Sequence, residues 1–229
     1  MDFKSFKLNS IDGIQIPCVK LSPDVQSDKT ALILPGYAYP VDGPLLFYTK
    51  FLLVKYGFHV ITIDYHYNER ETFLKLDENT KDKYFEKDQL FLADQLSEII
   101  KTESLLLCGK SIGTTAMTIM YDHPLIQRRL SSISFIWYTP AQAWNKVINI
   151  LKKGTNPSFL VVGDNDPYYD KEHHKSLESL SSYKELIIEG GGHLLEKEKD
   201  MTASIDNIKT AIKLLESLIN GDFFSAKKG

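Results

Sequence analysis

The chain has 229 residues, enough for one domain or at most two very small ones. Its 27 lysines and arginines nearly balance its 30 aspartates and glutamates, for a formal net charge of -3. It therefore has no basic excess of the kind that a dedicated nucleic-acid-binding protein uses to neutralise phosphates. Hydrophobic residues make up 43% and charged residues 25%, which is typical of a soluble globular domain and excludes a disordered chain.

The sequence also bears on the cellular compartment. The first residues carry charges throughout and no apolar segment, so we expect no secretory signal. No run approaches the roughly 18 uninterrupted apolar residues of a membrane span. Two cysteines, Cys18 and Cys108, are too few for a disulfide framework and fit a reducing compartment, although the count allows one disulfide. We therefore expect a soluble, cytoplasmic protein.

Short apolar runs typical of strands alternate with longer amphipathic stretches typical of helices. Residues 3–21 predict a β-hairpin around the turn dipeptide Asp12-Gly13. The other predicted strands are 30–34, 59–63, 104–108, 133–138, 158–162 and 185–188, and the predicted helices are 44–56, 84–101, 111–122, 141–153, 171–181 and 202–219. Residues 66–83 contain nine charged residues and little periodicity, which indicates an exposed excursion or a poorly formed helix.

This alternation predicts βαβ units and a mainly parallel sheet that is covered on both faces. No internal repeat or linker interrupts it, so we expect a single α/β domain over residues 1–229. Ligands of such sheets bind at the carboxyl ends of the strands. The candidate functional residues are therefore those that directly follow each strand.

One motif of this kind follows the strand at 104–108. Residues 109–113 read G-K-S-I-G and match G-x-S-x-G, which predicts a sharp strand-turn-helix connection that lifts the Ser111 hydroxyl above the sheet. The amides that begin the helix would face a developing oxyanion. The pattern does not predict a phosphate-binding loop, because the first glycine of that motif would fall on Ser104 and a hydrophobic strand would replace its flexible cradle. The remaining alternative is that Ser111 only caps the helix.

A nucleophilic serine needs a base, and the base needs an orienting acid. His193 follows three glycines directly after the last predicted strand, and Asp166 follows the strand before it. We prefer Asp166 to Asp164, which is expected to close the turn, and Asp170 is a third candidate. A surface-loop histidine and ordinary turn residues are the alternatives. No H-E-x-x-H or paired-cysteine pattern indicates a metal site.

With these motifs, the chain resembles the α/β-hydrolases along nearly its whole length. The resemblance implies an α/β-hydrolase fold of about eight mostly parallel strands, antiparallel only near the start, with helices on both faces. The site residues that it implies are the catalytic Ser111, Asp166 and His193 and the oxyanion-hole residues Tyr37 and Ile112.

Two positions depart from the family's pattern. Pro35 stands where the family often has a histidine in the oxyanion loop, a supporting part of the site. Lys110 precedes the nucleophile position, where many relatives have His, Glu or Tyr. We expect a solvated lysine side chain here, with recognition of a substrate carboxylate as the alternative.

The implied function is a serine hydrolase that cleaves a carboxylic ester or thioester of a small acyl substrate without metal or organic cofactor. The alternatives are other triad chemistry (peptidase, acyltransferase or C–C hydrolase) and a catalytically silent protein that binds a ligand or partner. The oligomeric state stays open. Residues 139–157, where the family commonly inserts a cap, suffice for one helix, so we expect a fairly open site. Seven aromatic residues near strand ends either line a pocket or are partly buried: Tyr37, Tyr39, Tyr65, Trp137, Tyr138, Tyr168 and Tyr169.

Overall fold

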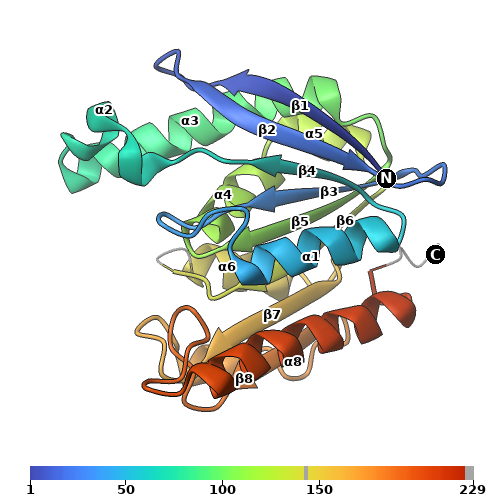
Figure 1. Ribbon diagram of the computed structural model, residues 1–229, viewed down its shortest axis with the longest axis vertical. Coiled ribbons are helices and arrows are strands. Elements are labelled where there is room, and N and C mark those ends of the chain that lie inside the picture. The colour runs from blue at the N-terminus through green and yellow to red at the C-terminus, as the bar shows by residue number, and fades with distance from the viewer. Residues whose placement is uncertain (142–143, 225–229) are drawn as a thin grey trace.

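The computed structural model describes residues 1–141 and 144–224. Its strands form one eight-stranded sheet in the order β1-β2-β4-β3-β5-β6-β7-β8 (Figure 1). The strands are β1 (Asp2–Asn9), β2 (Gln15–Ser22), β3 (Lys29–Leu34), β4 (His59–Ile63), β5 (Ser104–Lys110), β6 (Ser132–Tyr138), β7 (Ser158–Gly163) and β8 (Tyr183–Ile188). Strand β2 pairs antiparallel with β1 and β4, and all other neighbours are parallel. The predicted mostly parallel sheet with an antiparallel start is confirmed.

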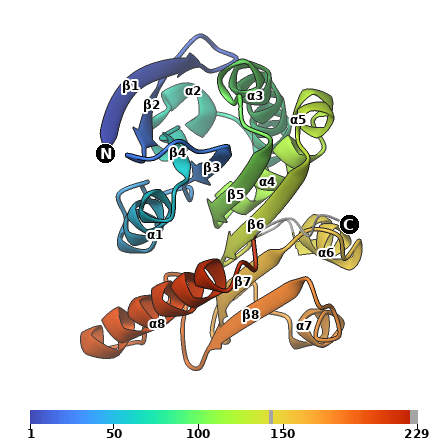
Figure 2. The same cartoon turned by 90° about the vertical axis from the view of Figure 1, so that its right-hand side faces the viewer.

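Helices cover both faces of this sheet. The helical elements are α1 (Pro44–Lys55), η1 (Tyr67–Glu69), α2 (Glu71–Leu74), α3 (Glu78–Ile99), α4 (Ile112–Tyr121), α5 (Pro124–Arg129), α6 (Trp144–Lys152), α7 (Lys171–Lys175) and α8 (Met201–Asn220). Figure 2 shows α1 and α8 on one face and α3, α4, α5 and α6 on the other. Each face thus has its own hydrophobic core.

Strand β3 shows why the central strands are almost purely apolar. Ala31 and Ile33 pack into the core beneath α1 and α8, whereas Leu32 and Leu34 pack into the core on the opposite face. Successive side chains of a strand point to opposite faces, so a strand covered on both sides has no solvent-facing position for a polar residue.

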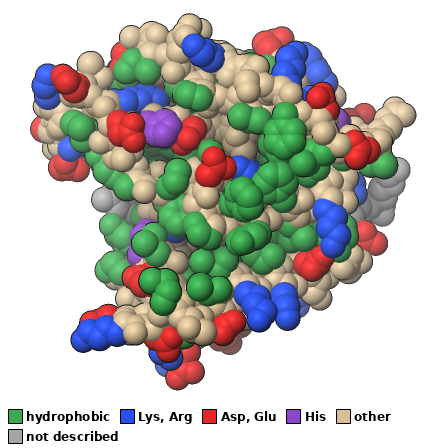
Figure 3. All heavy atoms as spheres, viewed as in Figure 1, with side chains coloured by type: hydrophobic (Ala, Val, Ile, Leu, Met, Phe, Trp, Pro, Cys, Tyr) green, Lys and Arg blue, Asp and Glu red, His purple; other side chains and the backbone are tan. Residues whose placement is uncertain are grey.

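The face that carries α1 and α8 also presents hydrophobic side chains to solvent (Figure 3). Phe47 and Tyr48 of α1 and Ile205 of α8 are exposed, and α8 fully buries only Ala211 and Leu215. A narrow apolar stripe therefore holds α8 against the sheet. Within the described ranges, no helix is long and apolar enough to cross a membrane.

The segment after β4 differs from the expected exposed excursion. It forms η1 and α2, and the side chains of Tyr67, Arg70 and Phe73 are buried. Helix α3 begins at Glu78, before the predicted start at Tyr84, and the Asp77 carboxylate caps it by accepting from the Thr80 amide at 3.1 Å. The first turns of α3 are solvent-facing and charged, so hydrophobic periodicity could not detect them.

Other helix boundaries also differ from the predicted ones. Helix α7 ends at Lys175 instead of continuing to 181, because the next residues form tighter turns, with the Leu177 amide donating to the His174 carbonyl at 2.9 Å. The short helix α5 was not expected. Of the helix predicted at 141–153, positions 142 and 143 lie outside the described residues, as do 225–229 of the expected domain.

The two cysteines lie in the core. Cys18 and Cys108 are both buried and free, so the single disulfide that the sequence allowed is absent from the described chain. Burial raises the pKa of both thiols, which keeps them protonated. Neither cysteine is therefore a ready nucleophile.

Candidate active site

Ser111 occupies the sharp turn between β5 and α4. Its backbone has φ 54° and ψ −119°, a conformation that a residue with a side chain rarely adopts. Gly113 allows the turn to pack closely, because a Cβ atom there would lie 2.2 Å from the Leu34 carbonyl oxygen. Ser111 makes no side-chain capping hydrogen bond to α4, so the helix-cap interpretation is wrong. The strained turn instead leaves the hydroxyl available for another partner.

That partner is His193, in the loop after β8. Its Nε2 lies 2.9 Å from the Ser111 Oγ, and its Nδ1 lies 2.8 Å from Oδ2 of Asp166. The Asp166 side chain has no exposed surface, and its other oxygen accepts from the Tyr168 amide at 2.9 Å. Because a carboxylate only accepts hydrogen bonds, this arrangement places a proton on Nδ1 and leaves Nε2 as the acceptor for the serine hydroxyl.

The other two aspartates considered as the acid have different partners. Asp164 accepts from the Gly190 amide at 2.6 Å, so its carboxylate joins the turn after β7 to the loop after β8 instead of closing its own turn as expected. Asp170 caps α7 by accepting from the amides of Glu172 and His173. Among the three, Asp166 is the residue whose carboxylate contacts His193.

Close backbone packing joins the Asp166 loop to the His193 loop. The Asn165 amide donates to the Gly191 carbonyl at 3.0 Å. A Cβ atom on Gly163 would lie only 1.9 Å from that same carbonyl oxygen. Because Gly163 has no Cβ atom, the two loops can pack closely enough for the Asp166 carboxylate to reach the His193 imidazole.

We expect Gly163→Ala to lower the free energy of unfolding by about 1–3 kcal/mol and to lower the activity of any folded protein, because the added methyl group separates the two loops. Gly221→Ala is the matched control, since its Cβ atom would meet no atom closer than 3.4 Å. Urea unfolding of both variants measures the difference. Equal stability of the two variants would contradict this account.

The two expected oxyanion-hole residues lie at the same edge of the sheet. Ile112 is the first residue of α4, where amides have no partner within the helix. Tyr37 lies in the loop after β3, whose turn is closed by the Gly36 amide donating to the Tyr39 carbonyl at 3.0 Å. The Leu34 and Pro35 carbonyls lie directly against Gly113 in the first turn of α4. The two backbone segments are thus neighbours.

The sequence matches no protein-family model and no curated protein. Solved structures do resemble it. A protein described as a predicted CIB-like hydrolase from Thermoplasma acidophilum is 18% identical with a TM-score of 0.62, over 95% of this chain and 100% of that one. Est1E from Butyrivibrio proteoclasticus is 13% identical with a TM-score of 0.61, over 94% and 99%. The Pyrococcus furiosus esterase Pf2001 is 15% identical with a TM-score of 0.61, over 96% and 92%. The chain has the α/β-hydrolase fold.

Within this α/β-hydrolase fold, Lys110 departs from the expected solvated side chain. It is 1% exposed, and its ammonium donates to the His193 carbonyl oxygen at 2.9 Å. Burial lowers the pKa of Lys110 to about 8, against the opposing effect of the Asp166 and Glu196 carboxylates. A buried ammonium with this partner is also unavailable to a substrate carboxylate.

The seven aromatic residues near the strand ends separate into three groups, one of which is the half-buried pair Tyr39 and Tyr169. Tyr65, Trp137 and Tyr138 are fully buried and belong to the core. Tyr37 and Tyr168 are exposed, and the Tyr168 ring meets the His193 ring edge-on with centroids 5.5 Å apart. These two tyrosines are the candidates for substrate contact.

Between residues 139 and 157, the described residues (139–141 and 144–157) form no cap. Helix α6 lies there, and its Trp144, Val147, Ile148 and Leu151 are buried in the core. Instead, the segment with η1 and α2 approaches the loop after β3, since the Phe73 and Tyr37 rings lie 6.4 Å apart. This segment borders the candidate active site.

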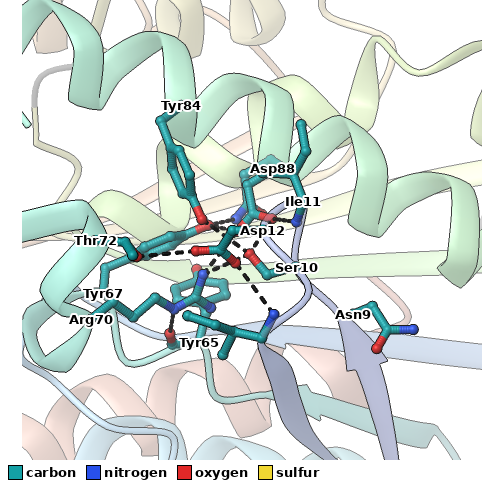
Figure 4. A network of polar contacts seen from close by, with 12 residues as sticks. Asn9, Ser10, Ile11, Asp12, Tyr65, Tyr67, Arg70, Thr72, Tyr84 and Asp88 are labelled. Carbon is teal, nitrogen blue, oxygen red and sulfur yellow. Dashed lines mark hydrogen bonds and ion pairs between the residues drawn. The ribbon is translucent and has the colours of Figure 1, made fainter.

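A buried polar network that the sequence analysis missed holds this bordering segment (Figure 4). Asp88 of α3 accepts from Ser10 at 2.7 Å and from Arg70 at 3.2 Å, and it also accepts from Tyr67. Arg70 further donates to the Tyr65 carbonyl at 2.7 Å. One signal was present in the sequence, because Asp88 lies on the same helix face as the apolar residues of α3.

Proposed function

We propose that the protein is a serine hydrolase that cleaves a carboxylic ester or thioester of a small substrate. The observation that carries the proposal is the continuous hydrogen-bonded series from Ser111 through His193 to Asp166, which begins at a strained serine. Backbone strain of this kind clusters at active sites, where the surrounding structure maintains it. The esterases and hydrolases among the structural neighbours support the same reaction class.

In the proposed reaction, the Ser111 Oγ attacks the acyl carbon while its proton passes to Nε2 of His193. The carbonyl electron pair moves onto the oxygen, and the Tyr37 and Ile112 amides stabilise that charge, each donor contributing about 3 kcal/mol. The intermediate collapses and expels the alcohol or thiol, which takes the proton from His193. Water then attacks the acyl-enzyme by the same sequence and releases the acid and the free serine.

The surroundings of Ser111 support a small or extended substrate. Helix α6 belongs to the core, so the side chains proposed to contact substrate are the exposed Tyr37 and Tyr168. The proposal also treats residues 1–229 as one domain, because its catalytic residues follow β5, β7 and β8 of one sheet.

A fluorophosphonate probe tests the nucleophile. We expect the probe to label the wild-type protein covalently and to leave Ser111→Ala unlabelled, with intact-mass spectrometry as the measurement. Ser134→Ala is the matched control, because Ser134 is a buried serine of β6 and should leave labelling unchanged. Hydrolysis of p-nitrophenyl esters of increasing chain length then identifies the preferred acyl group. A folded wild-type protein that takes up no probe would overturn the role of Ser111 as nucleophile.

A further inference from the structure

Lys110 is the buried charged group nearest in sequence to the proposed nucleophile. Lysine is almost never fully buried without a partner, because removing its charge from water is costly. The Lys110 ammonium has the His193 carbonyl as its acceptor, and no carboxylate of the described residues forms an ion pair with it. Among the described residues, the hydrogen-bond acceptor of this buried cation is therefore a main-chain carbonyl and not a carboxylate.

The surroundings of Lys110 include several parts of the site. Its stem passes the loop after β3, where Cγ lies 3.6 Å from the position that a Cβ on Gly36 would take. Its ammonium lies 5.5 Å from the centre of the Tyr39 ring in the same loop. The head group ends on the main chain of His193. Lys110 thus lies between the loop after β3 and the loop that carries His193.

Two consecutive residues consequently hold one histidine at two points. Ser111 contacts the imidazole through Nε2 at 2.9 Å, and Lys110 contacts the carbonyl of the same residue at 2.9 Å. His193 follows a run of three glycines, which has little intrinsic backbone stiffness. A charge-assisted hydrogen bond is roughly twice as strong as a neutral one, so the ammonium restricts this loop more than a neutral donor would.

We propose that Lys110 is a positioning residue, whose ammonium fixes the His193 main chain relative to Ser111 and so sets the distance over which the serine proton moves. This inference rests on the proposed serine-hydrolase function. Lys110 contacts neither substrate nor reacting atoms and acts through His193.

The ionisation of Lys110 gives this role a pH dependence. The charged or titratable groups around the ammonium are Asp166 after β7, Glu196 before α8, Tyr39 after β3 and His193 itself. Burial raises the pKa of Tyr39, so this phenol stays neutral where Lys110 titrates. Burial lowers the pKa of Lys110 to about 8, so the ammonium loses its proton at mildly alkaline pH and its bond to His193 weakens. We expect kcat to fall as the pH rises through this value.

As the pH rises, the contribution of Lys110 to stability should change in the opposite direction to kcat. An unfolded chain keeps the Lys110 proton up to the ordinary pKa of 10.5, whereas the folded protein releases it near 8. Between these values the unfolded state binds more protons, so the contribution of Lys110 to stability rises with pH. A fall in kcat over the same interval therefore reports positioning of His193 rather than loss of the fold.

Lys110→Met tests the proposal, because methionine retains an unbranched apolar stem without the charge. With p-nitrophenyl acetate as the probe substrate, we expect kcat to fall by about 10²-fold with KM changed by less than about threefold. The alkaline decline near pH 8 should disappear, and the melting temperature should equal or exceed that of the wild type. Lys110→Arg keeps a permanent charge and should restore part of kcat. Lys184→Met is the matched control, since Lys184 is exposed on β8.

The outcomes separate this inference from the function on which it rests. One outcome would overturn the positioning role alone: the fluorophosphonate probe labels the protein, but Lys110→Met keeps the kcat of the wild type and the same decline at alkaline pH. A wild-type protein that is neither labelled nor active at any pH would overturn the serine-hydrolase function, and the positioning role with it.

Discussion

Replacement of Asp166 with Asn is expected to lower kcat by about 10⁴-fold. The reason lies in the two oxygens of the carboxylate. The Tyr168 amide donates to Oδ1 at 2.9 Å, which selects the carbonyl oxygen of an asparagine for that position. The amide NH2 would then face Nδ1 of His193, at the place where Oδ2 now lies 2.8 Å away. An NH2 group donates, so the histidine proton would move to Nε2, which could no longer accept the serine proton.

Asp164→Asn is the matched control for this prediction. Asp164 lies in the same turn, and it accepts from the Gly190 amide at 2.6 Å, a bond that an asparagine oxygen can also accept. We expect this variant to keep kcat within a few-fold of the wild type. Steady-state hydrolysis of a p-nitrophenyl ester measures both variants, and thermal unfolding verifies that both are folded. A small effect at 166 together with a large effect at 164 would assign the acid to Asp164.

The proximity of Ser111, Asp166 and His193 could be predicted from the sequence because it depends on local patterns. Apolar runs locate the strands, and the carboxyl ends of parallel strands meet at one edge of the sheet. Residues directly after β5, β7 and β8 must therefore lie near one another, as Ser111, Asp166 and His193 do. The glycines that flank Ser111 and precede His193, together with the chain order Ser111, Asp166, His193, supported the same assignment.

The environment of Lys110 could not be predicted in this way. A charged side chain at the end of a strand ordinarily turns toward solvent, and only the combined positions of the loops after β3 and β8 bury this one. Lys110 and the His193 carbonyl that accepts from it are 83 residues apart in the chain. Periodicity carries no information about contacts of that kind.

Sequence periodicity likewise could not predict the buried polar network around Asp88. Asp88 and Arg70 have side-chain exposures of 0% and 4%. Asp88 joins three parts of the chain, since its acceptor oxygens meet Ser10 after β1, Tyr67 in η1 and Arg70 before α2. The sequence shows only a polar residue on an apolar helix face, without its distant partners.

Replacement of Asp88 with Ala is expected to lower the free energy of unfolding by about 3–5 kcal/mol, because it leaves the buried Arg70 charge without its carboxylate. Urea unfolding measures the loss. Glu71→Ala provides the control from the same segment. Its ion pair with Lys75 is exposed, and exposed pairs contribute at most about 1 kcal/mol.

The double variant Arg70→Met with Asp88→Leu separates the cost of an unpaired charge from the loss of packing. Apolar replacement of a whole buried pair is often neutral, so this variant should recover much of the stability that Asp88→Ala loses. A loss of less than about 1 kcal/mol in Asp88→Ala would contradict the structural role of the pair. Activity gives a second measurement, because the network holds the segment whose Phe73 ring lies 6.4 Å from the Tyr37 ring. We therefore expect folded Asp88→Ala protein to lose kcat through displacement of the loop after β3, whereas Glu71→Ala should keep it.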